Sequence, residues 1–429
     1  MSAPMSAAAA VVEASTKISA STISEEEAAV YDRQIRLWGL DAQNRLRNTS
    51  VLLVGLDGFA AEVVKNLMLA GLKSLTLMDD KNASEADTKS QFLIPLESLG
   101  QNRAEASLSR CRVLNPNVAC EAVVGSVSRM EDAFFTRYDF VCLIGQSLED
   151  NLRVNDICRG SGKGFCCGAA WGMLGYFFLD FIQVEYVVER EKPTEDTTDV
   201  VLDEPRRSGD HSGSRGLSGI SNPDSSSDII CADDADSDVN SKEPVSKRPK
   251  LSSHSPAGTT TTATSADSTL SKDITSSSDK IRVTMVENYV PMRDTLSVNF
   301  GAKCNLRTLK RWPPAYFLIH ALFKYHTETG RYPTSQDLND QTGDKISQSI
   351  RSHLAAVLEE QNAANKVAIP DDFPRYCGDL LNPVCAILGG ILAQEIIRGA
   401  TKSEAPVNNY FLIDASANFK GTVVKLPLN

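Results

Sequence analysis

The sequence predicts an α/β fold, a doubly wound parallel sheet with a helical insertion and a long disordered loop. Short segments that are almost wholly apolar, such as VLLVGL at 51–56 and YDFVCLIG at 138–145, are typical of parallel strands buried on both faces. Stretches of helical length separate such segments as far as about residue 181, and this alternation predicts right-handed crossovers. A long tract of Ser, Thr, Asp, Gly and Pro predicts the loop.

The elements follow in chain order from local residue patterns. Ser24 precedes three acidic residues, which is a typical helix start, so we expect one helix over 24–39. Gly71 is expected to end the helix after the first strand, and Pro116 stops the next helix. The predicted strands are 51–56, 74–80, 118–124, 138–145 and at least one within 164–181, and the predicted helices between them are 58–71, 102–115 and 148–162.

Two regions are expected to be disordered. Residues 1–23 have neither a basic start nor a long apolar centre, so they indicate a disordered tail and not a secretory signal. Residues 203–280 carry too few apolar side chains to bury a core, which predicts a disordered insertion. Inside the insertion, three basic residues form a candidate nuclear import signal, for which a chance basic patch is the alternative. These residues are Lys247, Arg248 and Lys250.

Residues 281–429 are predicted to supply a helical segment and then to complete the first sheet, so the folded part is divided into 24–202 and 281–429. Gly389 and Gly390 lie inside one predicted helix, where glycine costs stability, so close helix contact is expected at both, in the core or at a partner interface. The predicted helices are 312–330, 345–366 and 382–401, and the predicted late strands are 408–416 and 421–428.

The composition argues against several classes of function. A formal net charge of −11 disfavours general binding to nucleic acid or to anionic membranes. No apolar run is expected to approach the length of a membrane span. The ten cysteines form no CxxC pair and the five histidines lack ligand spacing, so we expect no metal site. The cysteines are interpreted as buried, reduced thiols of an intracellular protein.

The loop after the first strand has some features of a nucleotide-binding loop. A GxGxxG loop of a Rossmann-like fold needs small residues for its tight turn, for the approach of phosphate and for helix packing. Gly55 and Gly58 are present, but Asp57 stands where a glycine is usual and Ala60 replaces the last glycine. A carboxylate here repels phosphate and opposes the anion-attracting helix N-terminus. We therefore expect a degenerate loop that holds no nucleotide.

An acidic residue is expected about 20 residues after such a loop, where it binds ribose. Asp79 or Asp80 fills that position. The strand, the turn, the helix and the acid are thus all present, and the phosphate-binding part of the loop is the part that has changed.

Seven segments in order resemble the adenylation (ThiF-type) fold of the enzymes that activate ubiquitin and its relatives. Within that family the likeness is greatest to the smaller, non-thioester subunits of SUMO-activating enzymes, and it covers about 24–202 and 281–429. The segments are YDRQIRLWGLDAQNRLRNTSVLLVGL, EVVKNLMLAGLKSLTLMDD, SQFLI, GQNRAEASL, RYC, PVCAILGGILAQEI and NNYFLID.

In this family two similar folds pair across a pseudo-two-fold axis, and one of them binds ATP and Mg²⁺ while the other is degenerate. The active halves carry a stretch like NLNRQ, which is Asp87 to Gln91 here, so Ser90 replaces an arginine that meets phosphate. Arg103 stands at a second phosphate-facing position and keeps a positive charge. The resemblance implies that this chain is the inactive half.

The resemblance therefore implies a regulatory subunit that supports adenylation of the SUMO C-terminus and thioester formation on a larger subunit. The larger subunit would hold ATP, Mg²⁺ and the catalytic cysteine, and this chain alone would bind neither cofactor. A nuclear location fits this role. Three alternatives stay open: the corresponding subunit for the ubiquitin-like protein NEDD8, a non-catalytic interaction scaffold, and a stand-alone nucleotide-binding oxidoreductase.

One residue carries over from the family with a chemical role. Arg33, in the YDRQ segment, resembles an arginine that reaches across the dimer to the phosphates of ATP. A guanidinium suits this task, because negative charge collects on the departing pyrophosphate. The alternative is a salt bridge on the helix surface, with Asp32 or Glu27 as the partner. Arg36, one turn further along, is a weaker candidate for the same role.

Overall fold

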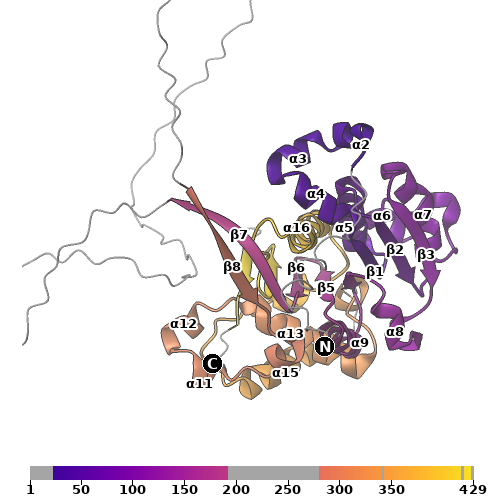
Figure 1. Ribbon diagram of the computed structural model, residues 1–429. Helices are drawn as coiled ribbons and strands as arrows, with labels where there is room; N and C mark the ends of the chain where they lie inside the picture. Colours follow the sequence, from indigo (N-terminus) through magenta and orange to yellow (C-terminus); the bar gives the residue numbers. More distant parts are fainter. Residues whose placement is uncertain (1–22, 192–279, 340–342, 417–419, 427–429) are drawn as a thin grey trace, which may run out of the picture. The chain divides into compact units, whose positions relative to one another are not determined.

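The computed structural model describes residues 23–191, 280–339, 343–416 and 420–426. Its centre is an eight-stranded sheet in the order β10-β9-β6-β5-β4-β1-β2-β3 (Figure 1). The strands β5, β4, β1, β2 and β3 are parallel, whereas β6, β9 and β10 are antiparallel to their neighbours. The bounds are β1 Ser50–Val54, β2 Ser74–Asp79, β3 Ala119–Val124, β4 Phe140–Ile144, β5 Gly164–Trp171, β6 Leu174–Asp180, β9 Tyr410–Asp414 and β10 Lys420–Val424.

The predicted fold class is confirmed. The central strands are apolar on both faces because helices cover both, and Leu52 and Leu53 of β1 are each fully buried although they point to opposite sides. The predicted completion of the sheet by the late strands is also confirmed, since β9 pairs with β6. Residues 164–181, expected to supply at least one strand, form two, because the chain turns back at Gly172 (φ +53°).

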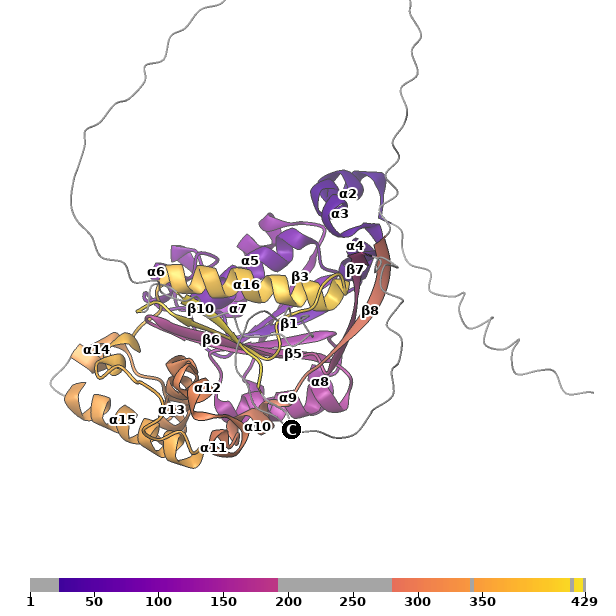
Figure 2. The same cartoon turned by 90° about the vertical axis from the view of Figure 1, so that its left-hand side faces the viewer.

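Helices lie on both faces of the sheet, as Figure 2 shows with α5 and α16 on one side and α9, α10 and α13 on the other. The first face carries α4 Leu40–Arg47, α5 Gly58–Ala70, α7 Arg103–Leu114 and α16 Asn382–Thr401. The second face carries α8 Asp132–Phe135, α9 Leu148–Gly160 and the helical insertion. The insertion consists of α10 Met292–Leu296, α11 Phe300–Lys303, α12 Leu306–Lys310, α13 Pro314–Thr329, α14 Ser335–Asn339 and α15 Gly343–Glu360.

Helix α16 corrects two expectations. Among the described residues it is the one helix long and apolar enough to cross a membrane, although no such run was expected, and 67% of that window is buried in the fold. A Cβ at Gly389 would overlap Glu62 and lie 3.1 Å from the carbonyl oxygen of Phe59, so α5 does pack very close there. Gly390 has no neighbour within 4 Å of such a Cβ, so the expectation of close packing within the chain was wrong for it.

The N-terminal region forms two short helices where one was predicted over 24–39, and a third short helix follows them. These helices are α2 Glu25–Val30, α3 Asp32–Trp38 and α4. Ser24 does begin α2, in a capping box with Glu27. The chain leaves helical geometry at Tyr31 and again at Gly39, whose φ of +88° places it in the left-handed region.

The remaining elements connect these layers. Strands β7 Gln183–Glu191 and β8 Lys280–Asn288 form a separate antiparallel ribbon, in which Glu191 pairs with Lys280. Lys280 therefore belongs to a strand and not to the predicted insertion. The rest of that insertion, residues 192–202 and the first 22 residues lie outside the described part of the chain. Short helical turns are α6 Asp87–Ser90 and the 3₁₀ segments Leu96–Ser98, Val127–Arg129 and Phe373–Tyr376.

Candidate functional site

The loop between β1 and α5 lies at the carboxyl end of the parallel strands, where α/β folds bind ligands. Gly55 has φ +86°, and a Cβ there would overlap the carbonyl oxygen of Ile144 and lie 2.8 Å from Nε2 of Gln146. Ile144 is the last residue of β4, the strand next to β1. The first retained glycine therefore lets the loop pack against the neighbouring strand.

The second retained glycine, Gly58, begins α5. A Cβ at Gly58 would lie 2.8 Å from the carbonyl oxygen of Ser90 and 2.9 Å from its Cβ. Ser90 ends α6, which is the stretch that corresponds to NLNRQ in the active halves. The space that a glycine leaves for the phosphate of a ligand is thus filled here by the protein's own backbone.

Asp57 is the N-cap of α5, as its Oδ1 accepts a hydrogen bond from the amide of Ala60 at 3.0 Å. Desolvation raises the pKa of Asp57 to about 6, against the hydrogen bond from Ala60 and the charge of Arg103, which both lower it. The helix N-terminus, which attracts anions, therefore already has an acidic group of the same chain. The predicted conflict between Asp57 and phosphate agrees with this geometry.

Asp79 ends β2 and holds the loop in place. Its Oδ2 accepts a hydrogen bond from the amide of Leu56 at 2.6 Å, and its Oδ1 accepts one from the amide of Lys81 at 2.8 Å. Its side chain is 3% exposed. Both carboxylate oxygens thus bind backbone of the same domain, at the position where a nucleotide-binding fold uses the acid for ribose.

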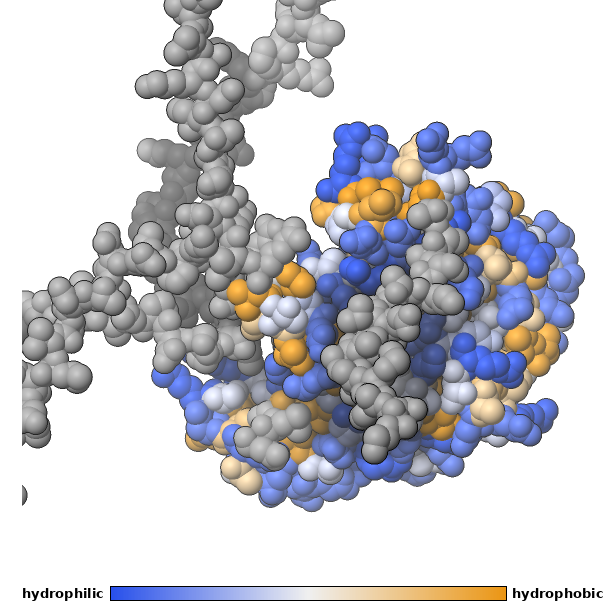
Figure 3. All heavy atoms as spheres, viewed as in Figure 1, coloured by the Kyte–Doolittle hydropathy of each residue, from blue (hydrophilic) through white to orange (hydrophobic). Residues whose placement is uncertain are grey.

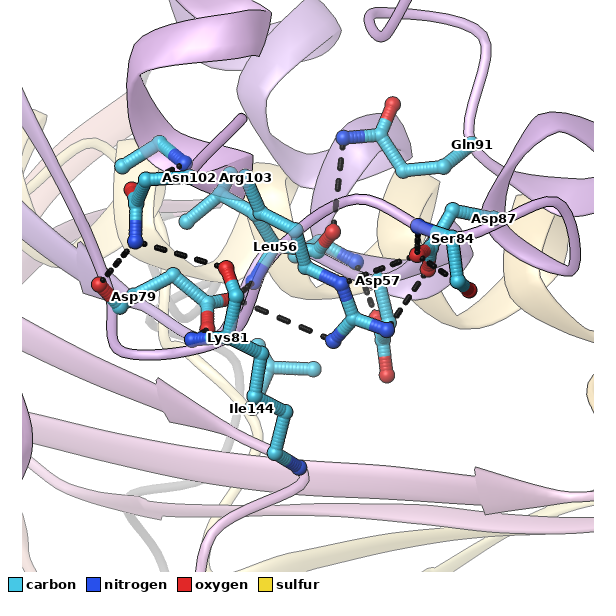
Figure 4. A network of polar contacts seen from close by, with 12 residues as sticks. Leu56, Asp57, Asp79, Lys81, Ser84, Asp87, Gln91, Asn102, Arg103 and Ile144 are labelled. Carbon is cyan, nitrogen blue, oxygen red and sulfur yellow. Dashed lines mark hydrogen bonds and ion pairs between the residues drawn. The ribbon is translucent and has the colours of Figure 1, made fainter. Parts of the chain in front are cut away.

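Arg103, at the start of α7, is the residue expected to keep a phosphate-facing charge. Figure 4 shows that its guanidinium points to Asp87, with Nη2 2.7 Å from Oδ1 and Nε 3.1 Å from Oδ2. Its Nη1 lies 4.0 Å from Oδ2 of Asp79. Ser84 donates to Asp87 through both its amide and its hydroxyl. The charge of Arg103 is present, but buried carboxylates of the same chain neutralise it.

The role of Asp87 was missed from the sequence, because only Ser90 of that stretch was compared with the family. Asp87 is 5% exposed, and a carboxylate buried to that extent needs a cation or hydrogen-bond donors as partners. The signal that could have found it is the loss of the arginine at position 90 together with the gain of an acid at position 87. Gln91 adds a further internal contact, since Nε2 lies 3.0 Å from Oγ of Ser107.

The space beside the loop is small. A cavity of about 160 Å³ adjoins the N-terminus of α5, whereas pockets for ligands the size of a drug or cofactor have about 300–1,000 Å³. A larger, open cavity of about 570 Å³ lies at the other end of β2 and β3, away from the loop. The small cavity is lined by Gly58, Glu62, Thr88, Lys89, Ser90, Gln91, Phe92, Asn382 and Cys385.

The residues of this loop therefore do not fit a bound triphosphate. Gly55 and Gly58 contact backbone, Asp57 occupies the helix end, and Arg103 is already paired. Within the described ranges, no group of three or more His, Cys, Asp or Glu side chains is arranged to hold a metal ion. The three residues of the candidate import signal, Lys247, Arg248 and Lys250, lie outside the described residues.

Arg33 lies on α3, far along the chain from this loop. Its side chain is exposed, and in the described part of the chain it has no hydrogen bond or ion pair. The two acids expected as alternative partners are engaged elsewhere. Asp32 pairs with Arg36 at 3.0 Å, and Glu27 pairs with Arg47 at 2.8 Å. The structure thus separates the two candidate arginines, because Arg36 has a local partner and Arg33 does not.

Exposed apolar side chains surround the same helices. Leu37 of α3 is 79% exposed and Leu40 of α4 is 50% exposed. Val30 and Leu69, at the ends of α2 and α5, are exposed as well. Figure 3 shows apolar residues gathered over the part of this face that Figure 1 assigns to α3 and α4. A contiguous apolar surface next to an unpaired cation is typical of a protein interface.

Comparison with known proteins identifies a family and several relatives of similar sequence. The family model described as the ThiF family matches residues 31–428. The SUMO-activating enzyme subunit 1 of Xenopus laevis is 35% identical over 396 residues, which cover 92% of this chain and 95% of that protein. The protein of the same name from Homo sapiens is 35% identical over 395 residues, covering 91% and 93%, respectively. That from Xenopus tropicalis is 36% identical over 396 residues.

Proposed function

The chain belongs to the ThiF family, and from this premise we propose that it is the smaller, non-thioester subunit of a SUMO-activating enzyme. The likeness to the relatives of that name spans nearly the whole of both chains, so it includes the N-terminal helices α2 to α4, the sheet and the helical insertion. The assembled enzyme uses ATP to adenylate the C-terminus of SUMO and then forms a thioester on its larger subunit. The corresponding subunit for NEDD8 is not favoured by these names.

ATP and Mg²⁺ are held mainly by the larger subunit. The observation that carries this part of the proposal is the packing at Gly58, where the backbone of Ser90 occupies the place of a phosphate. Asp57 supports it, since its carboxylate caps the helix end that would otherwise attract an anion. Arg103 supports it too, because Asp87 already uses two of its donors.

Arg33 is the catalytic contribution of this chain. Attack of the SUMO carboxylate on the α-phosphate of ATP forms an acyl-adenylate and releases pyrophosphate, so negative charge grows on the leaving group. An arginine that has no partner among the described residues, on a helix that projects from the domain, can reach phosphates held by another subunit. Arg36 is a supporting candidate only, because Asp32 already binds it.

The heterodimer is the proposed working state. Leu37 and Leu40 lie exposed on the helices that carry Arg33, so an interface there would bury apolar surface and bring the arginine to the partner. A nuclear location is part of the proposal, and it is supported by the basic residues of the insertion alone.

Exchange of labelled pyrophosphate into ATP in the presence of SUMO tests this function. The isolated chain is expected to give no exchange, and addition of the larger subunit is expected to restore it. Robust exchange by the isolated chain would contradict the degenerate loop. A second candidate, a pure scaffold, is favoured if the assembled pair keeps its full exchange rate after Arg33→Ala.

A further inference from the structure

The C-terminal end of α5 is held by three amide side chains. The last carbonyl groups of a helix have no partner within it and need other donors. Here the donors come from three different elements: α3, α4 and the residue that follows α7. The pairs are Gln34 Nε2 to Leu69 O at 3.5 Å, Gln43 Nε2 to Ala70 O at 3.1 Å, and Asn115 Nδ2 to Met68 O at 2.8 Å.

Asn115 makes a second contact of equal length. Its Nδ2 also donates to the phenol oxygen of Tyr31 at 2.8 Å, and one amide nitrogen can do both because it carries two hydrogens. Asn115 is 7% exposed and Tyr31 is 4% exposed, so neither group can exchange this partner for water. The Asn115 side chain therefore joins the end of α5 to Tyr31, the residue immediately before α3.

The Tyr31 ring is fixed by shape as well as by its hydroxyl group. A Cβ at Gly71 would lie 2.5 Å from both Cζ and the phenol oxygen of Tyr31. Gly71 ends α5 with φ +84°, a conformation that other residues rarely adopt. The ring thus rests on backbone, at a distance that only glycine permits.

The helices around Tyr31 have few other attachments. No residue of α2 or α3 is fully buried, and Trp38 of α3 is partly buried against the core, so Tyr31 is the fully buried apolar residue between the two helices. Besides the Gln34–Leu69 hydrogen bond, the polar attachments are the Glu27–Arg47 ion pair and Gln43, whose Oε1 accepts a hydrogen bond from Trp38 at 3.0 Å. The direction of α3 therefore depends on a small number of buried contacts at Tyr31, immediately before the helix.

We propose that Asn115, acting through Tyr31, is a positioning residue for Arg33 in the adenylation step. The inference rests on the proposed role of Arg33. Arg33 lies two residues after Tyr31, so a shift of Tyr31 moves the start of the helix that carries the guanidinium. A displacement of about 1 Å can cost about 10²-fold in rate when a group must meet developing charge.

The test measures pyrophosphate exchange by the assembled enzyme for two substitutions. Asn115→Ala removes both hydrogen bonds that Nδ2 donates and the one that Oδ1 accepts from the amide of Asn117, and Tyr31→Phe keeps the ring and removes one acceptor. We expect kcat to fall about 10-fold for Asn115→Ala and about 3-fold for Tyr31→Phe, with the KM for ATP changed less than about 2-fold. This split distinguishes a misplaced transition-state contact from weaker ATP binding.

A double-mutant cycle with Arg33→Ala separates positioning from general damage. If Asn115 acts through Arg33, Asn115→Ala should cost less than about 2-fold once Arg33 is already alanine. An equal loss in both backgrounds would overturn the inference and leave the function of Arg33 intact, and so would wild-type kcat in folded Asn115→Ala. A wild-type kcat for Arg33→Ala alone would remove both the proposed role of Arg33 and this inference.

Asn48→Ala is the matched control. Asn48 is an exposed amide side chain at the end of α4, and it donates to the carbonyl oxygen of Asn44 at 2.8 Å without touching α5 or Tyr31. We expect its kcat to equal that of the wild type. Thermal unfolding and co-purification with the larger subunit report whether each variant folds and assembles. If Asn115→Ala does not fold, the cycle is run with Tyr31→Phe, for which the same non-additivity is required.

Discussion

The two ends of α5 are built on opposite principles. At its N-terminus, Asp57 caps the helix and Ser90 fills the space at Gly58, so every group that could meet a nucleotide meets protein. At its C-terminus, the carbonyl groups are also satisfied, but the helices that satisfy them leave Arg33 and Leu37 exposed. We call the N-terminus of α5 the closed end, because its groups contact other residues of this chain. We call its C-terminus the open end, because the helices packed there expose side chains that another chain could cover.

This difference teaches how a binding fold becomes a supporting subunit. At the closed end, carboxylates of the chain lie where a helix N-terminus and a buried arginine attract negative charge. Asp57 and Asp87 supply those negative charges. At the open end, an arginine and an apolar side chain, Arg33 and Leu37, are exposed where contact with another chain is expected.

The largest effect is expected from Arg33→Ala. We expect kcat for pyrophosphate exchange by the assembled pair to fall about 10²-fold, because one donor to the developing charge is lost. Thermal unfolding should be unchanged, since Arg33 has no partner within the described chain. Arg36→Ala is the control, and it should lower kcat by less than about 3-fold. Equal losses for the two arginines would contradict the distinction between them.

A smaller effect is expected at the closed end from Gly58→Ala. The new methyl group meets the Ser90 backbone, which cannot move as a flexible side chain can, so the chain should lose about 1–3 kcal/mol of unfolding free energy. Chemical denaturation measures this loss. If the alanine variant were as stable as the wild type, the space beside Gly58 would be open and a phosphate could enter it.

The charge at the closed end is tested by Asp57→Asn. Asparagine caps a helix as well as aspartate does, but it never ionises. The pKa of Asp57 is raised to about 6 in the folded chain from 3.8, so the folded state loses stability as the pH rises from about 4 to about 6. Above pH 7 we expect the asparagine variant to be more stable by about 1–3 kcal/mol. Urea unfolding at pH 4 and pH 7.5 measures it, and an equal difference at both pH values would contradict the raised pKa.

The smallest effect is expected from Gly390→Ala in α16, away from either end of α5. Its side chain would meet open space, and alanine favours a helix over glycine by about 0.5–1 kcal/mol, so the chain should gain that amount. Gly389→Ala, one residue earlier, should destabilise the chain because it faces Glu62 and Phe59. Opposite signs in thermal unfolding would establish which glycine faces α5.

The sequence was sufficient for the parts of the fold that depend on local patterns. Apolar runs located β1, β2 and β4, and Gly71 marked the end of α5. It was insufficient where the helical conformation is interrupted between α2 and α3. This interruption depends on the packing of Tyr31 against Gly71, 40 positions later in the chain. The number of strands within 164–181 was left open because the two-residue turn at Gly172 carries no strong local signal.

The candidate site was predicted in part. Asp57 and the missing glycine could be recognised because a known loop has known requirements. The filling of the loop by Ser90 and the pairing of Arg103 with Asp87 could not be recognised, because both are contacts between separate elements. The role proposed for Arg33 stays a prediction, although its alternative partners, Asp32 and Glu27, are bound to other arginines.

The β7–β8 ribbon has a consequence for how this chain tolerates changes in length. Because Glu191 and Lys280 are paired residues, the polypeptide departs from the ribbon and rejoins it at one place. Shortening or extending the intervening sequence therefore leaves the ends of the sheet where they are, and each doubling of such a loop costs only about 0.6 kcal/mol. A fluorescent protein or an affinity tag could be spliced in at this point without touching either end of α5.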